Sequence, residues 1–163
     1  MCVNDMLQIH TKQNGFDIYD IKLYFSAMTA SSNKSRRILF IIFDKFELLD
    51  LSGPSSVFNG ANSLLQQTVY KIHILSSTGG PIKSGAAITI QSENINTITA
   101  CSNDTIMVVG GSKNALENTS SDLHLQKWLR QNAHNAERLT SVCSGAFLLA
   151  QHGFLDDKNA TTH

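Results

Sequence analysis

The sequence has no excess of either charge and no long apolar run. Its formal net charge is zero, and 16% of its 163 residues are charged, so we expect no basic surface that binds nucleic acid directly. No stretch of about 18 or more apolar residues occurs, so no membrane-spanning helix is predicted. Neither an internal repeat nor a low-complexity linker divides the chain. Its length therefore suits one domain with a sizeable core.

Cysteine is scarce, and the spacing of the three cysteines forms no known motif. Cys2, Cys101 and Cys143 are odd in number, widely spaced and outside any CxxC motif, which indicates neither a disulfide framework nor a zinc site. The histidines lack ligand spacing with acidic or thiol partners, so we expect no metal and no cofactor. The run Gly110-Gly111-Ser112 lacks the Lys-Ser/Thr ending of a phosphate-binding loop. The cytoplasm is the expected compartment.

The first 30 residues contain no continuous hydrophobic stretch of the signal-peptide kind. Met28 is followed by a polar, basic lead-in that resembles a natural start of translation. We therefore interpret residues 1–27 as an over-long gene prediction or an extension. The expected division is a poorly ordered extension over residues 1–35 and one domain over residues 36–163.

Apolar runs of strand length alternate with helical patterns along residues 36–163. Such runs are typical of strands that are buried on both faces, and the alternation predicts an α/β domain with a mainly parallel sheet flanked by helices. Strands are predicted at residues 37–43, 70–76, 104–109, 139–143 and 158–162, with a small hairpin around 86–90 and one helical turn within 95–99. Helices are predicted at residues 54–65, 121–135 and from Cys143 through Gln151, with Trp128 and Phe147 expected in the core.

Five polar or glycine residues follow the predicted parallel strands. Asp50 lies in the loop after the first strand, Gly110 and Gly111 come directly after the third, Cys143 ends the fourth and His163 ends the fifth. Because ligands bind outside the carboxyl ends of the strands in such sheets, we expect these residues to share one edge. Together they predict a binding or catalytic site there.

Cys143 carries the clearest chemical signal in the chain. It lies between a short apolar strand and an apolar helix, followed by Ser144 and Gly145. This pattern predicts a tight turn where helix N–H groups favour the thiolate, which is the nucleophilic form. The Gly110 and Gly111 N–H groups, and the Ser144 hydroxyl or N–H, are candidates for stabilising a developing negative charge.

Asp50 is interpreted as an acid–base partner of Cys143. A carboxylate beside a thiolate repels it, so the pair is consistent only if the two groups share one proton. Such a pair can protonate a substrate carbon or nitrogen after thiolate attack. The alternative interpretation of Asp50 is a carboxylate that caps a helix or stands in a loop.

Five segments together resemble the DJ-1/PfpI superfamily over about residues 36–163. They are residues 48–54 (Leu-Leu-Asp-Leu-Ser-Gly-Pro), 108–111 (Val-Val-Gly-Gly), 141–150 (Ser-Val-Cys-Ser-Gly-Ala-Phe-Leu-Leu-Ala), 153–156 (Gly-Phe-Leu-Asp) and 160–163 (Ala-Thr-Thr-His). The resemblance is greatest to the N-terminal, amidotransferase-like domain of AraC-type transcriptional regulators and to isonitrile hydratases. It implies a flavodoxin-like, DJ-1-type fold, although one scaffold hosts many functions.

The resemblance also implies residue roles. Cys143 matches the cysteine of the nucleophile elbow, Asp50 the acidic residue beside it, and Gly111 the backbone donor that faces it. His163 matches a histidine found near the cysteine in several branches, where it acts as a base or orients the thiol. Homodimers are implied as well.

Three functions remain open. The first is a sensor domain of an AraC-type regulator, in which a cysteine pocket binds a small amide, nitrogen compound or other metabolite. The second is an isonitrile-hydratase-like enzyme or another cysteine-dependent hydrolase or lyase that uses Cys143 and Asp50. The third is a non-catalytic remnant. The regulators carry a helix-turn-helix region, and the domain normally continues beyond the Ala-Thr-Thr-His segment, so we expect a C-terminally truncated chain that does not bind DNA itself.

Overall fold

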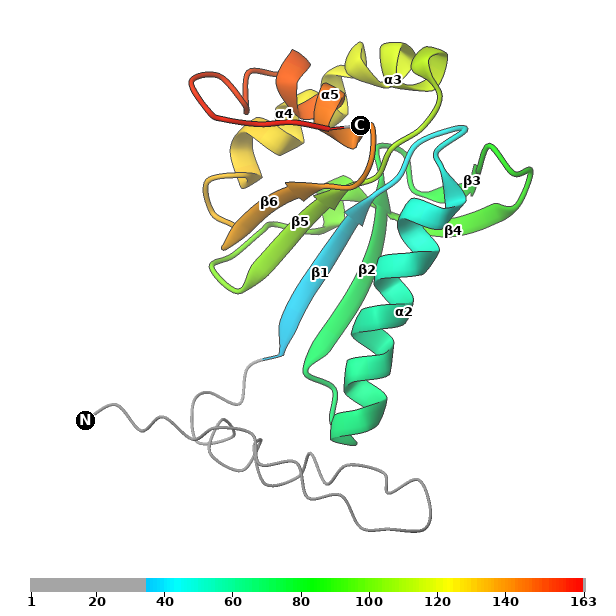
Figure 1. Ribbon diagram of the computed structural model, residues 1–163, viewed down its shortest axis with the longest axis vertical. Helices are drawn as coiled ribbons and strands as arrows, with labels where there is room; N and C mark the ends of the chain where they lie inside the picture. Colours follow the sequence, from blue (N-terminus) through cyan, green and yellow to red (C-terminus); the bar gives the residue numbers. More distant parts are fainter. Residues whose placement is uncertain (1–34, 163) are drawn as a thin grey trace, which may run out of the picture. The chain divides into compact units, whose positions relative to one another are not determined.

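The structure is a computed structural model that describes residues 35–162 (Figure 1). The predicted N-terminal extension falls almost wholly on residues 1–34, outside the described residues. His163 also lies outside them. The predicted division of the chain at residue 35 therefore stays a proposal.

The described residues form an α/β domain around a 6-stranded sheet in the order β3-β4-β2-β1-β5-β6 (Figure 1). Five strands run parallel, and β3 pairs antiparallel with β4 as a hairpin at one edge. The strands are β1 (Arg36–Ile41), β2 (Tyr70–Ser76), β3 (Gly80–Lys83), β4 (Thr89–Asn94), β5 (Asp104–Val108) and β6 (Arg138–Ser141). The predicted mainly parallel α/β fold is confirmed, as are the strands in β1, β2 and β5 and a hairpin near residue 86.

Strand β1 lies at the centre because its sequence suits burial on both faces. Leu39, Phe40 and Ile41 have no exposed surface, and β1 pairs with β2 on one side and β5 on the other. Burying a side chain of this size stabilises the fold by about 1.5–3 kcal/mol. The continuous apolar run of β1, which predicted a strand buried on both faces, therefore lies at the centre of the core.

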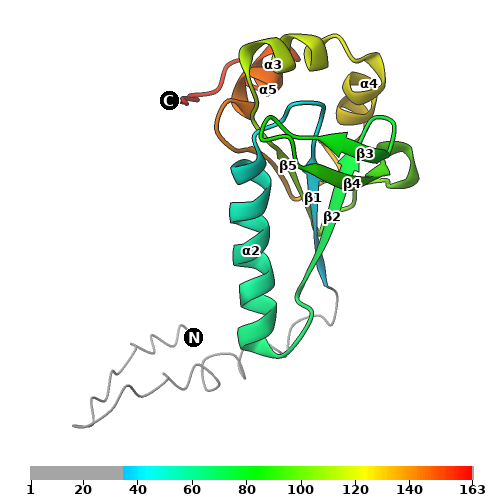
Figure 2. The same ribbon diagram turned by 90° about the vertical axis from the view of Figure 1, so that its right-hand side faces the viewer.

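Helices cover both faces of the sheet. They are α2 (Leu48–Leu65), α3 (Lys113–Ser120), α4 (Leu123–Asn132) and α5 (Gly145–Gln151), with a single 3-10 turn at Ile95–Thr97 as predicted. Figure 2 shows α2 on one side of the sheet and α4 on the other. The end of α5 meets α4, where the Nδ1 of His152 lies 3.2 Å from the amide nitrogen of Gln126. Trp128 of α4 is buried, as predicted, and its indole N–H donates to the carbonyl of Ile98 at 2.9 Å.

Helix α2 begins earlier than predicted, and this moves Asp50 from a loop into a helix. The prediction started the helix at Pro54 because proline suits a first turn. In the structure Glu47 is the N-cap, its carboxylate accepts from the Leu49 N–H, and Pro54 lies inside the helix. Gly53 precedes the proline, and its missing Cβ relieves part of the clash that proline imposes on the residue before it.

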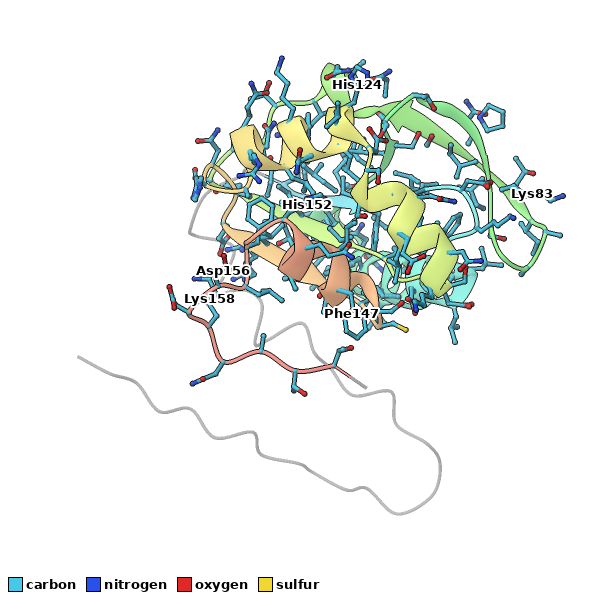
Figure 3. The ribbon with its side chains drawn as sticks, turned by 90° about the horizontal axis from the view of Figure 1, so that it is seen from above. Lys83, His124, Phe147, His152, Asp156 and Lys158 are labelled. Carbon is cyan, nitrogen blue, oxygen red and sulfur yellow. The ribbon has the colours of Figure 1, made fainter. Side chains whose placement is uncertain are left out.

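Other predictions were wrong in detail. Residues 113–120 form a helix that was not predicted, started by the Ser112 side chain accepting from the Ala115 N–H. Phe147, expected in the core, is 51% exposed and points outward in Figure 3. The predicted fifth strand at residues 158–162 is absent from the described part of the chain, where a turn ends at Lys158 and irregular backbone follows. A strand needs a backbone partner, and none is recorded there.

The amino ends of the strands hold a cluster of charged side chains. Arg37 of β1 donates from Nε to Asp104 Oδ1 of β5 at 2.8 Å, and Asp104 has no exposed surface. Burial alone raises the pKa of Asp104, but hydrogen bonds from Arg37 and from the Cys101 N–H outweigh it and lower the pKa overall. Arg37 Nη2 also lies 3.6 Å from Cys101 Sγ. This ion pair joins two central strands at the edge opposite the predicted site.

Within the described residues, no helix has both the length and the apolar character needed to cross a membrane. The helix α2 is the longest of them, at 18 residues.

Candidate functional site

Two loops at the carboxyl edge of the sheet are joined by backbone pairing. The loop after β1 meets the residues after β5 through a bridge between Phe46 and Gly111, and the Glu47 N–H donates to the Gly110 carbonyl at 2.8 Å. Phe46 is fully buried, which holds the two loops together at this contact. Helix α2 begins at Leu48, directly after Glu47, so its first turn lies against Gly110.

Asp50 stands in that first turn and is 8% exposed. Its Oδ2 accepts a hydrogen bond from the Gly110 N–H at 2.9 Å. The positive end of the α2 dipole also favours a carboxylate in the first turn. The carboxyl group of Asp50 is therefore held at the end of β5, as the sequence predicted, but by a helix rather than by a loop.

The chain turns sharply between β6 and α5. The Val142 N–H still pairs with the Val108 carbonyl at 2.9 Å, and the Gly145 N–H closes the turn onto the Val142 carbonyl at 3.0 Å. Cys143 lies between them with a φ of 53°, a left-handed conformation that non-glycine residues rarely adopt. Its side chain is partly exposed. Backbone strain of this kind often accompanies a functional position.

Ser144 binds the turn to the loop that follows β5. Its Oγ accepts from the Gly111 N–H at 3.1 Å and donates to the Gly111 carbonyl at 2.9 Å. Ser144 is the N-cap of α5 but makes no side-chain capping bond, since its hydroxyl is directed to Gly111 instead. The Cys143 Sγ lies 4.0 Å from this hydroxyl. The thiol and the residues after β5 are thus in one small site.

Glycine is required at two positions in this site. A Cβ built on Gly110 would lie 2.6 Å from Asp50 Oδ2, 2.7 Å from Ser144 Oγ and 3.0 Å from the Ser144 backbone nitrogen. A Cβ on Gly145 would lie 2.5 Å from the Val108 carbonyl oxygen. A Cβ at either position would thus come closer than about 3 Å to neighbouring atoms, so these two glycines allow the starts of α2 and α5 to approach the end of β5.

The structure brings together Cys143, Ser144, Gly110, Gly111 and Asp50. It also shows something that spacing did not predict: the N–H groups of both glycines already donate to side chains, to Asp50 and Ser144 respectively. Sequence spacing places a backbone N–H at a site, but it does not show whether a neighbouring side chain accepts from it.

The Thr162 hydroxyl donates to the Cys143 carbonyl at 3.0 Å, so the last described residue also reaches this turn. The role predicted for His163 stays a prediction, because that residue is outside the described part. Across residues 35–162, no three His, Cys, Asp or Glu side chains are grouped in a way that would hold a metal ion.

Comparison with known proteins places this geometry in a family. The DJ-1/PfpI family matches residues 36–163. The chain is 36% identical over 127 residues to an uncharacterised protein of Streptomyces lividans encoded in the cpoL 5' region, covering 78% of this chain and 86% of that protein. It is 31% identical to the isonitrile hydratase of Pseudomonas putida, covering 78% of this chain and 52% of the enzyme.

A transcriptional regulator and a solved structure are also similar. The HTH-type transcriptional regulator GlxA of Rhizobium meliloti (strain 1021) is 25% identical, with 84% of this chain and 41% of the regulator covered. The crystal structure of an AraC family transcriptional regulator from Pseudomonas putida shares the fold with a TM-score of 0.65 and 23% identity, covering 78% of this chain and 66% of that chain. This chain thus spans about half or less of GlxA and of the isonitrile hydratase. The match to the family over residues 36–163 and the identity to the Streptomyces protein establish that the chain belongs to the DJ-1/PfpI family.

Proposed function

We propose that residues 36–163 form a sensor domain of the kind found in AraC-type transcriptional regulators, which binds a small metabolite in a pocket beside Cys143. Cys143 lies at the carboxyl edge of the sheet, where ligands of open α/β folds bind. The ligand class is a small amide or another small nitrogen compound. Similarity to HTH-type regulators such as GlxA and GbdR supports this choice.

One observation favours binding over turnover. An enzyme that attacks a carbonyl or isonitrile carbon through a thiolate needs N–H donors aimed at the developing negative charge. The two glycine N–H groups nearest the site instead donate to Asp50 Oδ2 and Ser144 Oγ, at 2.9 and 3.1 Å. They hold the start of α2 and the Cys143 turn against the end of β5, and catalysis through them would require those hydrogen bonds to break.

Ligand binding is tested by thermal unfolding of the full chain with acetamide, cyclohexyl isocyanide and methylglyoxal as separate probes. A ligand that binds only the folded protein raises the melting temperature, and at 100 times its Kd it stabilises the fold by about 2.7 kcal/mol. We expect an increase with acetamide that is reduced in Cys143→Ala and retained in Cys101→Ala. Equal shifts in both variants, or no shift with acetamide, would contradict the sensor.

A cysteine-dependent hydratase or hydrolase is the second candidate, favoured by the 31% identity to isonitrile hydratase and by the left-handed Cys143. In that case Cys143 is the nucleophile and Asp50 the proton donor. The Ser144 N–H donates to no acceptor among residues 35–162. It is therefore the backbone donor that could stabilise a developing negative charge on the substrate. Turnover of cyclohexyl isocyanide or methylglyoxal that disappears in Cys143→Ala would establish this function over the first.

The family resemblance implies a homodimer, and α2 offers a surface for it. Leu49, Val57 and Leu64 are 70–74% exposed. At about 100° per residue they lie within an arc of about 80° on the helix, together with Gly53 and Gly60. A Cβ on either glycine would meet nothing within 4 Å. We propose that this stripe packs against a second copy.

Sedimentation of the full chain tests this dimer. We expect Val57→Asp to convert a dimer to a monomer, because an unpaired carboxylate buried in an apolar contact is costly. Asn59→Asp adds the same charge on the exposed, polar side of α2 and serves as the matched control. A chain that sediments as a monomer before any substitution would rule the dimer out.

A further inference from the structure

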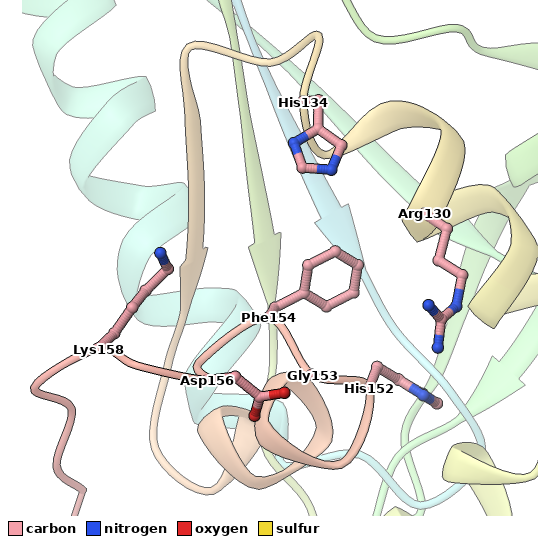
Figure 4. Close-up of a pocket in the computed structure, with 7 residues that line it drawn as sticks. All are labelled: Arg130, His134, His152, Gly153, Phe154, Asp156 and Lys158. Atoms are coloured by element: carbon pink, nitrogen blue, oxygen red, sulfur yellow. The ribbon is translucent and has the colours of Figure 1, made fainter.

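A pocket lies at the far end of α5 from Cys143. Its volume is about 340 Å³, and it is formed by the end of α4, the turn after it and the turns that follow α5. Figure 4 shows the side chains around it. Helix α5 starts after Ser144 and ends before His152, which separates this pocket from the cysteine by about 10 Å of helix. The lining residues are Arg130, His134, His152, Gly153, Phe154, Asp156 and Lys158.

His152 contributes a buried hydrogen-bond donor to this pocket. The residue is 5% exposed, and its Nδ1 lies 3.2 Å from the amide nitrogen of Gln126. The pKa of His152 is lowered, mainly by burial and to a smaller extent by the charge of Arg130. The ring is therefore neutral near pH 7. Since the Gln126 amide donates to Nδ1, the ring proton must be on Nε2.

The Nε2–H has no acceptor within residues 35–162, although the atom is buried. Buried polar groups are nearly always hydrogen-bonded, and an exception calls for an explanation such as a missing ligand. In Figure 4 the ring of His152 lies below the guanidinium of Arg130. An acceptor group between these two side chains would satisfy both.

The rest of the lining is also rich in donors. Arg130 and Lys158 take part in no ion pair among the described residues, since the ion pairs recorded there involve other side chains. Asp156 is the one carboxylate in the lining, against two permanent cations and two histidines. Phe154 supplies an aromatic wall. The pocket therefore presents an excess of donors and positive charge beside an apolar surface.

We propose that this pocket binds a small organic anion, whose carboxylate or phosphate accepts hydrogen bonds from Arg130, Lys158 and the His152 Nε2–H. Charge-assisted hydrogen bonds of this kind are stronger than neutral ones, and arginine matches the planar fork of a carboxylate or phosphate. The apolar part of the ligand packs against Phe154. This site is independent of the Cys143 pocket and of the function proposed for it.

Calorimetric titration of the full chain at constant ionic strength tests the site. The probes are inorganic phosphate, phenyl phosphate, benzoate and benzyl alcohol. We expect phenyl phosphate or benzoate to bind, inorganic phosphate to bind more weakly because it cannot contact Phe154, and benzyl alcohol not to bind. The stronger of the two aromatic anions identifies the acid group. Failure of both aromatic anions to bind at about 10 mM, where even a weak site would fill, would overturn the proposal.

Matched variants separate a defined site from general charge attraction. Arg130→Gln should weaken binding about tenfold, as expected for loss of a charge-assisted bond, whereas Lys127→Gln removes the same charge from the same helix outside the pocket and should leave binding within about twofold. Cys143→Ala should leave it unchanged. Equal weakening by Arg130→Gln and Lys127→Gln would contradict the proposal.

The nitrogen resonances of His152 provide a direct readout in the folded protein. The Nε2 signal should move on saturation with the bound anion, and the Nδ1 signal should move less because its partner, Gln126, is unchanged. An unmoved Nε2 signal at saturation would show that the anion does not contact His152, and would overturn the site as described.

Discussion

Ser144 Oγ and the backbone of Gly111 form a reciprocal pair: the hydroxyl accepts from the Gly111 N–H at 3.1 Å and donates to the Gly111 carbonyl at 2.9 Å. The two residues are 33 positions apart in the chain. Their contact holds the turn that carries Cys143 against the loop after β5. It also engages the Gly111 N–H, which is then not available to donate to a developing negative charge on a substrate.

Ser144→Ala should destabilise the domain by about 1–3 kcal/mol, because it leaves the Gly111 N–H and carbonyl without their partner in a partly buried site. Urea unfolding measures the change. Ser63→Ala removes a hydroxyl that donates to a helix carbonyl on the exposed side of α2, and should cost less than about 0.5 kcal/mol. Equal costs for the two variants would show that the Ser144 contact contributes little.

Gly110→Ala should disrupt the candidate site. The new Cβ would lie 2.6 Å from Asp50 Oδ2 and 3.0 Å from the Ser144 backbone nitrogen, and backbone cannot move aside as a flexible side chain can. We expect a loss of about 1–3 kcal/mol from overpacking, measured by urea unfolding, and a loss of any ligand-induced thermal shift.

Gly85→Ala is the control for this glycine substitution. Its Cβ would meet only carbonyl oxygens at 3.6 Å, an ordinary contact, and its N–H keeps the bond to Phe46. A Gly110→Ala protein that is as stable as Gly85→Ala would mean that the site is looser than described.

Asp104→Asn should destabilise the domain by about 3 kcal/mol at pH 7, since it leaves Arg37 without its buried countercharge. The folded pKa of Asp104 is lowered, so its contribution is complete above the unfolded value of about 3.9 and is lost as the pH falls below it. Urea unfolding at pH 7 and pH 3 should therefore show a smaller acid loss in the variant than in the wild type. Glu117→Gln, which breaks an exposed pair with Lys113, should change stability by less than about 0.5 kcal/mol.

His152→Gln should flatten the pH dependence of stability below about pH 6.5, the unfolded histidine value. The folded pKa is lowered, so the unfolded chain binds more protons and stability falls as the pH drops from that value toward the folded pKa. The other charged or titratable side chains that line the same pocket are those of Arg130, His134, Asp156 and Lys158.

This pH effect is measured by urea unfolding at pH 7.5 and 5.5. The slope lost on substitution should not exceed about 1.4 kcal/mol per pH unit, the limit for one proton. The control is His124→Gln, which changes an exposed histidine in the first turn of α4, outside the pocket, and should keep the wild-type slope. A wild-type slope in His152→Gln would contradict the prediction.

Local patterns predicted the buried strands well and the ends of elements less well. The apolar run of β1 was identified because burial on both faces leaves residues 38–41 without a polar position, and the shorter apolar runs in β2 and β5 were sufficient to identify those strands. The start of α2 was missed because Pro54 is normally unfavourable inside a helix, and here capping by Glu47 with Gly53 before the proline allows it. Phe147 was wrongly predicted in the core, since α5 buries Leu148 and Leu149 and leaves Phe147 on its exposed side.

The position of Cys143, Asp50 and the two glycines at one edge of the sheet was predicted, but their hydrogen bonds were not, and the place of His163 stays a prediction. Cys143, Asp50 and the two glycines share an edge because parallel strands end on one side, which strand order alone implies. The pocket around His152 was missed, since α4 carries no recognisable motif and the segment 153–156 was used only for the family resemblance.

The sequence by itself determined the family, the mainly parallel sheet and the identity of the residues at its carboxyl edge, because these depend on local apolar runs and on ordered short motifs. Only the tertiary structure decided that the Gly110 and Gly111 N–H groups are bonded to Asp50 and Ser144. Those bonds join residues 60 and 33 positions apart. They depend on how two helix ends pack onto β5, which no local pattern records.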